Sequence, residues 1–460
     1  MKRRTFSVEG KKVVVAGAAR SGVAAAHLLA RRGAAVTLSD LRQSLTEAAE
    51  LEAAGIALEL GGHTAATFAA ADLIVLSPGV PRHQPVIEAA RSAGTEVIGE
   101  LELASRWLAG RIVAITGTKG KSTTTTLAGR MLEAGGHKVL VGGNIGHALS
   151  AQVEASTDET IHVVEASSFQ LEGIETFHPW IAVLLNFSPD HLDRHATVDE
   201  YAAAKARIFE NQSAADWAVL NADDDASLVI ARDAQARRLM LSMTEQLADG
   251  IVLDGRAIVS RREGSSEPLV PLTSIRLLGR HLLVDVMAAS AVAHIAGVQP
   301  AAMTAAVEGF TGLEHALEPV IDIAGVQFVN DSKATNIEAA RRAIESFGEG
   351  LVVILGGRFK GGDFADLAAP LSARRATVIA IGEAHDRIVA ALGKDVAVHS
   401  AADMASAVRQ AFAAAAPGST VLLAPACSSF DMFKDYAERG RLFKQEARKL
   451  ETDWNGTREQ

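Results

Sequence analysis

Short runs of β-branched and aliphatic residues alternate with alanine-rich segments of helical period along the whole 460-residue chain. Such alternation is typical of α/β domains built on parallel sheets, because each helix returns the chain so that the next strand can lie beside the last. The alternation falls into three blocks. We therefore predict three α/β domains, comprising residues 1–104, 105–311 and 312–460.

The strongest motif is Gly117–Thr126, GTKGKSTTTT, which follows the apolar run RIVAITG. Two glycines permit a tight turn with inward-pointing amides, and a Lys-Ser pair adds a charge and a hydroxyl at the start of a helix. We predict an edge strand, a phosphate-binding loop and a helix; a threonine-rich helix cap that binds nothing is the alternative. Two residues separate these glycines, whereas four separate those of a Walker loop. The predicted phosphate-binding residues are Gly117, Thr118, Lys119, Gly120, Lys121, Ser122 and Thr123.

A second strand–turn–helix pattern occurs at Gly17–Gly22, GAARSG, and Asp40 ends the next predicted strand. The pattern is similar to a dinucleotide-binding turn in which Ala19 replaces the middle glycine, where a side chain crowds a bound pyrophosphate. An NAD(P)-dependent oxidoreductase and a plain turn that binds nothing are both open alternatives. A diphosphate of another kind would also suit the helix N-terminus.

Three further polar residues belong to the central block. Glu165 and His191 each follow an apolar strand, so both are expected at the sheet edge that carries the phosphate loop. Together they could hold a hard cation, although a helix-capping glutamate and a hydrogen-bonded core histidine explain them equally well. Lys205 lies in a helical stretch, YAAAKARIFE, and taken alone is interpreted as a surface lysine.

Lysines and hydroxyls follow three strands of the last block, in NDSKATN (Asn330–Asn336), in LGGRFKGGD and after STVLLAPACSSF. They predict a pocket for a small anion such as a carboxylate, and solvated loops are the alternative. The residues concerned are Asp331, Lys333, Thr335, Lys360, Ser429 and Tyr436.

The net charge of -10 argues against sequence-independent binding to nucleic acid, which needs a basic face. The single cysteine, Cys427, excludes an internal disulfide and fits a reducing compartment. No apolar run reaches the ~18–20 residues that cross a bilayer. We expect a cytoplasmic monomer with small-molecule substrates.

Several motifs, in this order, resemble those of the Mur ligases, ATP-dependent enzymes that form amide bonds in cell-wall precursor synthesis. The matching stretches are GTKGKST, GGNIG (Gly142–Gly146), VEASSFQLE (Val164–Glu172), NFSPDHLDRH (Asn186–His195), YAAAKARIFE and NDSKATN. The resemblance covers essentially the whole chain, and it displaces the oxidoreductase interpretation.

The resemblance implies a Rossmann-like first domain, a central ATPase domain of P-loop type and a Rossmann-like third domain. It implies that ATP and Mg²⁺ serve to join D-glutamate to UDP-N-acetylmuramoyl-L-alanine through an acyl-phosphate. The implied catalytic residues are Lys121, Glu165, His191 and Lys205, and the implied metal ligands are Ser122, Glu165, His191 and Lys205 in carbamylated form. The implied contacts to the UDP substrate are Ser21, Asp40, Arg42, Ser77, Pro78, Gly79, Asn144, Ser167 and Gln170. Asp331 is implied to contact ATP, and Lys333, Thr335, Lys360, Ser429 and Tyr436 to bind glutamate.

Two stretches depart from the family pattern. Where the family usually has G-x-H-N-x-x-N, this chain has GRHLLVD, so that Leu282 and Asp285 replace asparagines expected near the adenine. Where the family usually has G-L-x-H-R-x-E, the chain has GLEHALE, with Ala316 in place of arginine. Losing such hydrogen bonds predicts weaker ATP binding or turnover. A catalytically silent precursor-binding protein and a ligase for L-glutamate are the alternatives.

Overall fold

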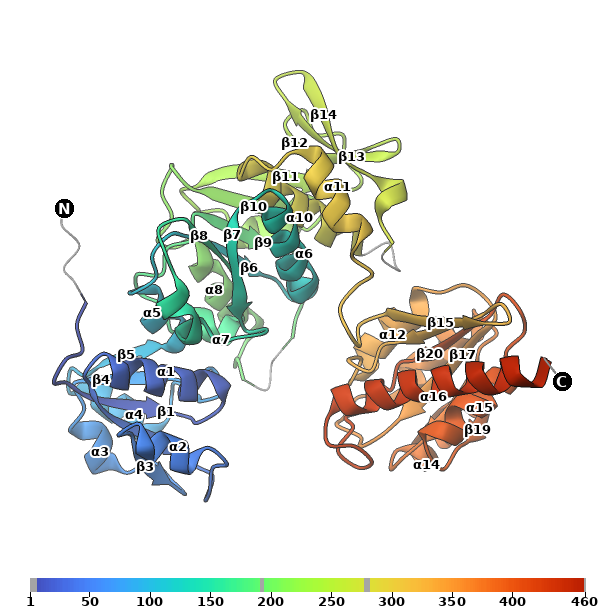
Figure 1. The fold of residues 1–460 in the computed structure, drawn as a ribbon, viewed down its shortest axis with the longest axis horizontal. Helices are drawn as coiled ribbons and strands as arrows, with labels where there is room; N and C mark the ends of the chain where they lie inside the picture. Colours follow the sequence, from blue (N-terminus) through green and yellow to red (C-terminus); the bar gives the residue numbers. More distant parts are fainter. Residues whose placement is uncertain (1–5, 191–193, 277–281, 459–460) are drawn as a thin grey trace. The chain divides into compact units, whose positions relative to one another are not determined.

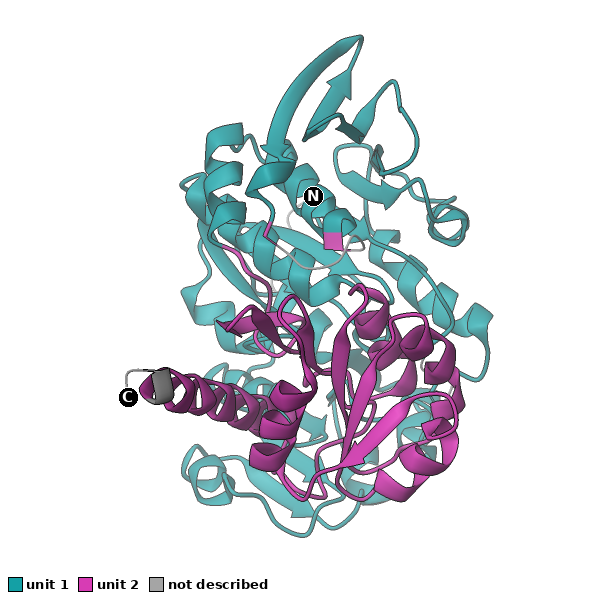
Figure 2. Cartoon of the chain, turned by 90° about the vertical axis from the view of Figure 1, so that its right-hand side faces the viewer, with its two compact units in different colours: residues 1–275, 283–309 teal, residues 276–282, 310–460 magenta. Residues whose placement is uncertain are grey.

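The computed structural model describes residues 6–190, 194–276 and 282–458. They contain three sheets flanked by helices, which confirms the predicted three-domain α/β fold (Figure 1). The chain divides into two compact units, residues 1–275 with 283–309 and residues 276–282 with 310–460 (Figure 2). The first unit contains two of the sheets and the second contains the third. The domain boundaries near residues 104 and 312 stay predictions.

The first sheet is fully parallel, with strand order β3-β2-β1-β4-β5. Its central strands are almost continuously apolar because helices cover both faces. The strand order reverses between β1 and β4, which is where open α/β sheets bind ligands. The strands are β1 (Lys12–Ala16), β2 (Ala35–Asp40), β3 (Ala57–Leu60), β4 (Leu73–Leu76) and β5 (Glu96–Gly99), and the helices are α1 (Arg20–Arg31), α2 (Ala48–Ala53), α3 (Ala65–Ala69) and α4 (Pro85–Ser92).

Helix α5 (Glu100–Ser105) leads from the first sheet to the second. Its Leu101 and Ala104 are fully buried in one apolar cluster with Leu28 of α1 and with Leu149 and Phe177 of the central block. The first two sheets are therefore joined by a shared core within one unit.

The second sheet has the order β14-β13-β12-β11-β10-β9-β6-β8-β7. The strand before the phosphate loop, β6, pairs with β8 and β9, so the predicted edge strand is wrong: the loop starts in the interior of the sheet. The predicted hairpin at Asp254–Gly255 is confirmed by the antiparallel pairing of β12 and β13. The strands are β6 (Arg111–Thr116), β7 (Lys138–Gly143), β8 (Thr160–Glu165), β9 (Ile181–Leu184), β10 (Trp217–Asn221), β11 (Arg237–Ser242), β12 (Gly250–Asp254), β13 (Ala257–Arg262) and β14 (Ser265–Pro271).

Helices and short 3-10 turns surround this second sheet. The predicted helix near residues 281–296 is present as α10 within the described residues. The helices are α6 (Lys121–Ala134), α7 (Ser168–Leu171), α8 (Val198–Ala206), α9 (Asp225–Ile230), α10 (Leu282–Ile295) and α11 (Pro300–Glu308), with 3-10 turns η1 (Leu149–Ala155), η2 (Arg207–Phe209) and η3 (Leu272–Ser274).

The third sheet has the order β15-β16-β20-β17-β18-β19 and is parallel except for the antiparallel edge strand β15. Separate apolar clusters cover its two faces. Its strands are β15 (Glu318–Ile323), β16 (Val326–Asn330), β17 (Leu351–Gly356), β18 (Thr377–Ile381), β19 (Ala397–Ser400) and β20 (Thr420–Leu423). Its helices are α12 (Ile337–Glu345), α13 (Ala368–Ser372), α14 (His385–Leu392), α15 (Met404–Ala414) and α16 (Tyr436–Arg458), with the 3-10 turn η4 (Phe364–Leu367). None of the helices in the described residues has the length and apolarity needed to span a bilayer.

Candidate functional site

The loop between β6 and α6 has a fixed backbone. Gly117 and Gly120 have φ angles of 152° and 81°, which strongly favour glycine. Asn186, just after β9, holds the loop: its Oδ1 accepts the Lys119 N–H at 2.9 Å and its Nδ2 donates to the Lys119 carbonyl at 3.2 Å. The Thr118 N–H donates to the Asn186 carbonyl at 3.1 Å. Asn186 begins the stretch NFSPDHLDRH, but the sequence alone does not indicate that this residue holds the loop.

Two lysines converge on one carbonyl of this loop. The Nζ of Lys121 donates to the carbonyls of Gly117 and Thr118, each at 2.9 Å. The Nζ of Lys205, on α8, also donates to the Gly117 carbonyl, at 2.8 Å. The structure thus brings together two predicted site residues that lie 84 positions apart in the sequence (205 − 121).

Lys205 is a buried lysine, only 1% exposed, and not the surface residue that its helical setting alone indicates. Burial, together with the smaller effect of the nearby charge of Lys121, lowers the pKa of Lys205 to about 6. Its Nζ lies 4.8 Å from the centre of the Tyr201 ring, and the Tyr201 hydroxyl is 3.3 Å from Thr118 Oγ1. The Lys205 amine is therefore largely neutral at pH 7.

Glu165 ends β8, which pairs directly with β6, so its carboxylate belongs to the same sheet edge as the loop. Its Oε1 accepts a hydrogen bond from Asn144 Nδ2 at 2.7 Å. Its Oε2 is buried and has no hydrogen-bond partner among the described residues. A buried carboxylate oxygen without a donor fits a hard cation such as Mg²⁺. His191 lies outside the described residues, and within those residues no three His, Cys, Asp or Glu side chains cluster as a metal site.

Asp285, one of the two family departures on α10, lies directly against the loop. A Cβ placed on Gly120 would overlap the Asp285 carboxyl group, so a side chain at position 120 would have to displace that group. Burial raises the pKa of Asp285 well above its ordinary value, although the charge of Lys121 opposes this effect. The start of the phosphate loop helix therefore packs on a carboxyl group that resists ionisation.

The short helix α7 carries two predicted substrate residues. Ser167 and Gln170 form a capping box, in which the Ser167 hydroxyl accepts the Gln170 N–H and Gln170 Oε1 accepts the Ser167 N–H at 3.0 Å. His195 supports the helix, because its Nε2 lies 3.0 Å from Ser168 Oγ. Asn144, the third residue predicted here, is exposed apart from its bond to Glu165.

The predicted diphosphate residues lie at the carboxyl ends of β1, β2 and β4. A Cβ on Gly17 would be 3.0 Å from Ser77 Cβ, so the GAARSG turn and the Ser77–Gly79 loop are neighbours. Ser21 is half-buried in the first turn of α1. Arg194 reaches this loop from the central block and donates to the carbonyls of Gly79 at 3.1 Å and Pro78 at 3.4 Å.

Asp40 is engaged within the protein. Its Oδ2 accepts the Ala18 N–H at 2.5 Å, and its Oδ1 accepts from Arg42 Nε at 2.9 Å. The Arg42 guanidinium holds the pKa of Asp40 well below its usual range. Asp40 therefore fixes the turn and orients Arg42, whose side chain is 54% exposed and accessible to a ligand.

In the second unit, the predicted residues lie at the carboxyl ends of β16, β17 and β20. Lys360 Nζ lies 3.3 Å from Thr335 Oγ1, while Lys333 is exposed. Asp331 is buried and accepts the Leu317 N–H at 3.2 Å, and burial raises its pKa to about 7. Ser429 is also buried, and Tyr436, which begins α16, is 41% exposed.

Sequence reasoning missed Arg439, which is fully buried on α16. It donates to Ser332 Oγ and to the Ser332 carbonyl, each at 2.9 Å, and to the Cys427 carbonyl at 3.1 Å. These bonds tie together the two loops that carry Lys333 and Ser429. An arginine in a helix as charged as α16 gives no sign in the sequence that it faces inward.

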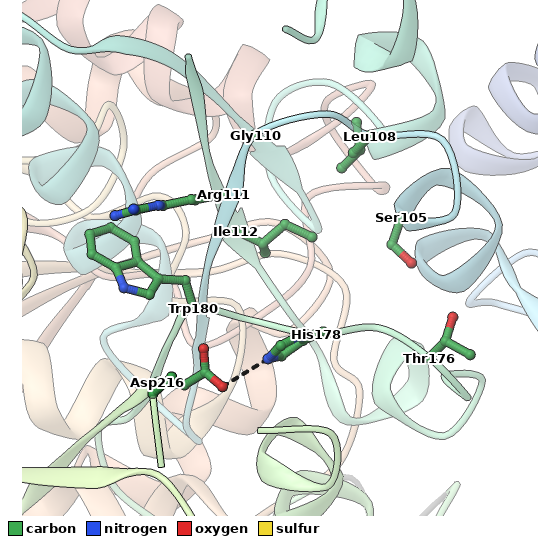
Figure 3. A pocket seen from close by; sticks show the side chains of 10 residues that line it. Ser105, Leu108, Gly110, Arg111, Ile112, Thr176, His178, Trp180 and Asp216 are labelled. Carbon is green, nitrogen blue, oxygen red and sulfur yellow. Dashed lines mark hydrogen bonds and ion pairs between the residues drawn. The ribbon is translucent and has the colours of Figure 1, made fainter. Parts of the chain in front are cut away.

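A cavity of about 370 Å³ lies at the opposite edge of the second sheet, where β6, β9 and β10 begin (Figure 3). The polar groups there pair with one another: His178 Nε2 is 2.8 Å from Asp216 Oδ2, and the Arg111 guanidinium lies 4.5 Å from the centre of the Trp180 ring. None of the predicted site residues lines it.

Three α/β domains, with a phosphate-binding type of loop after the interior strand β6, are the architecture of a multidomain nucleotide-binding protein. Three family models match the chain: the Mur ligase MurD-like N-terminal domain at residues 11–99, the Mur ligase middle domain at 115–293 and the Mur ligase glutamate ligase domain at 317–427. The chain belongs to the Mur ligase family.

Curated relatives cover nearly the whole chain. The protein named UDP-N-acetylmuramoylalanine–D-glutamate ligase from Acidobacterium capsulatum is 46% identical over 95% of this chain and 96% of its own length. The protein of the same name from Geobacter metallireducens is 45% identical over 97% and 99%. The family resemblance seen in the motifs is thereby confirmed.

Solved structures share the fold at low identity. UDP-N-acetylmuramate-alanine ligase MurC from Thermotoga maritima matches with a TM-score of 0.60 and 17% identity, over 96% of this chain and 100% of its own. MurF ligase from Thermotoga maritima, solved in complex with ADP, matches with a TM-score of 0.58 and 16% identity, over 96% of each chain.

Proposed function

We propose that this chain is an ATP-dependent ligase that joins D-glutamate to UDP-N-acetylmuramoyl-L-alanine in the synthesis of peptidoglycan precursors. The observation that carries the proposal is the geometry of the phosphate loop. Asn186 accepts a hydrogen bond from the loop backbone, and the Gly117 carbonyl accepts hydrogen bonds from both Lys121 and Lys205. The names of relatives that are 45–46% identical over nearly the full length support the substrates. We further propose that it acts as a monomer in the cytoplasm.

The reaction has two steps. A carboxylate oxygen of the muramoyl-alanine attacks the γ-phosphorus of ATP, and ADP leaves. The amine of glutamate then attacks the acyl carbon, loses a proton, and inorganic phosphate leaves. The loop amides and Lys121 neutralise charge on the transferring phosphoryl group, which is the main contribution that a protein makes to such a transfer.

Glu165 and Ser122 would hold Mg²⁺, together with His191, and Mg²⁺ would offset phosphate charge. The unpartnered Oε2 of Glu165 supports this assignment. We assign Lys205 as a carbamylated ligand. A buried amine with a lowered pKa is in the neutral form that adds to carbon dioxide and releases a proton, giving an anionic oxygen donor.

Further predicted site residues are assigned to the two substrates. Arg42 and the loop Ser77–Gly79 are proposed to bind the uridine diphosphate portion, and Gln170 to bind the muramoyl-alanine portion. In the second unit, the pair formed by Lys360 and Thr335 is proposed to bind a glutamate carboxylate, since it offers one charge and one hydroxyl within 3.3 Å.

The test is ATP-driven ligation with purified protein and UDP-N-acetylmuramoyl-L-alanine, in which product and released phosphate are both measured. Separate reactions contain D-glutamate, L-glutamate or no amino acid, and one omits bicarbonate. We expect product and phosphate only with D-glutamate, and less product when bicarbonate is omitted. Phosphate release that does not depend on both substrates, or product only with L-glutamate, would contradict the proposal.

A second candidate is a ligase with weakened ATP use, or a silent precursor-binding homologue. It is favoured by the buried carboxyl of Asp285 against Gly120, because ionisation there would oppose the phosphates. Asp285→Asn is then expected to lower the Michaelis constant for ATP several-fold, and the double variant Leu282→Asn with Ala316→Arg to raise turnover. This second candidate would be dismissed if Asp285→Asn left the Michaelis constant for ATP unchanged and the double variant did not raise turnover.

A further inference from the structure

Two buried polar atoms on neighbouring elements of the first unit have no partner among the residues that the structure describes: Glu100 Oε2 and Gln170 Nε2. Glu100 begins α5 and is 1% exposed, and Gln170 lies on α7 and is 2% exposed. Buried polar groups of folded proteins almost always have a hydrogen-bond partner. An acceptor and a donor that both lack one therefore call for an explanation.

The other atoms of these two side chains are fixed. Glu100 Oε1 accepts the Ser150 N–H at 2.7 Å. Gln170 Oε1 accepts both the N–H and the hydroxyl of Ser167 at 3.0 Å, which determines the orientation of its amide and directs Nε2 away from Ser167. The Gln170 N–H groups thus need an acceptor elsewhere.

Both side chains line the same small cavity, of about 10 Å³, together with Ser77, Pro78 and Phe169. That volume is about the minimum that can hold one water molecule, which also needs about two to four polar partners. The surrounding backbone holds the two sides in register, because the Gly99 N–H donates to the Gly173 carbonyl at 2.9 Å. A Cβ on Gly173 would be 2.7 Å from the Gly99 Cα, so the close approach of these two backbone segments favours glycine at both positions.

We propose that Glu100 is a positioning residue for the muramoyl part of the nucleotide substrate. One water in this cavity accepts a hydrogen bond from Gln170 Nε2 and donates one to Glu100 Oε2. The second Nε2 hydrogen of Gln170 is thereby directed to an acceptor on the substrate, beside the loop of Ser77 and Pro78. This inference rests on the proposed function, in which Gln170 binds the muramoyl-alanine portion.

Glu100→Gln is the test variant. The new side chain keeps an oxygen for the Ser150 N–H but turns an amide donor toward the cavity, so the water no longer has its acceptor. We expect the Michaelis constant for UDP-N-acetylmuramoyl-L-alanine to rise about ten-fold, as for one lost hydrogen bond. The Michaelis constant for ATP and kcat should stay within about two-fold of wild type. In a Gln170→Met background the same change at Glu100 should have no further effect.

Glu102→Gln is the matched control. Glu102 is an equally buried glutamate on α5, and its carboxylate accepts the N–H groups of Glu175, Thr176 and Phe177 at 2.9 Å. Its replacement is expected to lower the unfolding temperature without raising the Michaelis constant for the nucleotide substrate. The inference is overturned if Glu100→Gln leaves the Michaelis constant for the nucleotide substrate unchanged. It is also overturned if Glu100→Gln raises that constant equally in the Gln170→Met background. Failure of the wild type to ligate or to bind the nucleotide substrate by calorimetry would instead overturn the proposed function, and this inference with it.

Discussion

Lys121 and Lys205 both donate to the Gly117 carbonyl, so a single backbone oxygen connects the phosphate loop to α6 and α8. The loop from Gly117 to Thr123 can be recognised in the sequence, because glycine spacing and a Lys-Ser pair are local properties. The burial of Lys205 is not local: α8 must first pack beneath the loop before its lysine can reach the Gly117 carbonyl. Asp40 illustrates the opposite case, in which the residue lies where expected but its oxygens are taken by Ala18 and Arg42.

The lowered pKa of Lys205 predicts a pH dependence of stability. An unfolded lysine keeps its proton up to its ordinary pKa of 10.5, whereas the folded one loses it near pH 6. Between these values the unfolded chain binds more protons, so the free energy of unfolding rises with pH, by at most about 1.4 kcal/mol per pH unit. This contribution is complete above pH 10.5 and is lost as the pH falls toward 6.

Urea unfolding in carbon-dioxide-free buffers at pH 6.5, 7.5 and 8.5 measures this effect. Lys205→Met should show a flatter rise with pH than wild type, while the exposed Lys394→Met should follow wild type. Parallel curves for wild type and Lys205→Met would show that the buried amine is not the cause.

Elements are predicted better than their pairing. The alternation of apolar runs and alanine-rich segments indicates most strands and helices, since periodicity is a property of each segment. The neighbours of a strand depend on the whole sheet, which is why β6 was expected at an edge and lies between β8 and β9. The hydrogen bonds between Asn186 and the phosphate loop depend on that pairing, because the end of β9 reaches the loop only when β9 lies beside β6.

Asn186→Ala is expected to loosen the loop at this junction. Both hydrogen bonds to Lys119 are lost, and each typically contributes about 0.5–1.5 kcal/mol. We expect a Michaelis constant for ATP about ten-fold higher and a modest loss of stability. Asn211→Ala, which removes two bonds to the carbonyls of Glu175 and Phe177, serves as the control for lost stability alone. An equal rise of the Michaelis constant for ATP in both variants would argue against a specific role for Asn186.

At the scale of the whole molecule, the sequence indicates three blocks, whereas the structure has two compact units. Periodicity marks each sheet, but it does not reveal that α5 carries apolar side chains into the core of the second sheet. The shared cluster of Leu28, Leu101 and Phe177 therefore makes the first two domains one packed body.

Two units with separate cores predict that the chain does not unfold in one step. Of the four tryptophans, Trp107, Trp180 and Trp217 belong to the first unit and Trp454 to the second. In Trp454→Phe, tryptophan fluorescence reports the first unit alone, while circular dichroism reports both. We expect the two urea transitions to differ in this variant, and coincident transitions would indicate one cooperative unit.

The contact between Gly120 and Asp285 has a consequence for mutational tolerance. A methyl group at position 120 would overlap the carboxyl group, and its φ of 81° would be strained as well, so two independent penalties fall on one position. The adjacent Lys119 directs its ammonium to Asp190 at 3.3 Å and has no such constraint. Randomising the loop should therefore leave position 119 open to many amino acids and position 120 to glycine alone, a steep change in tolerance between adjacent codons.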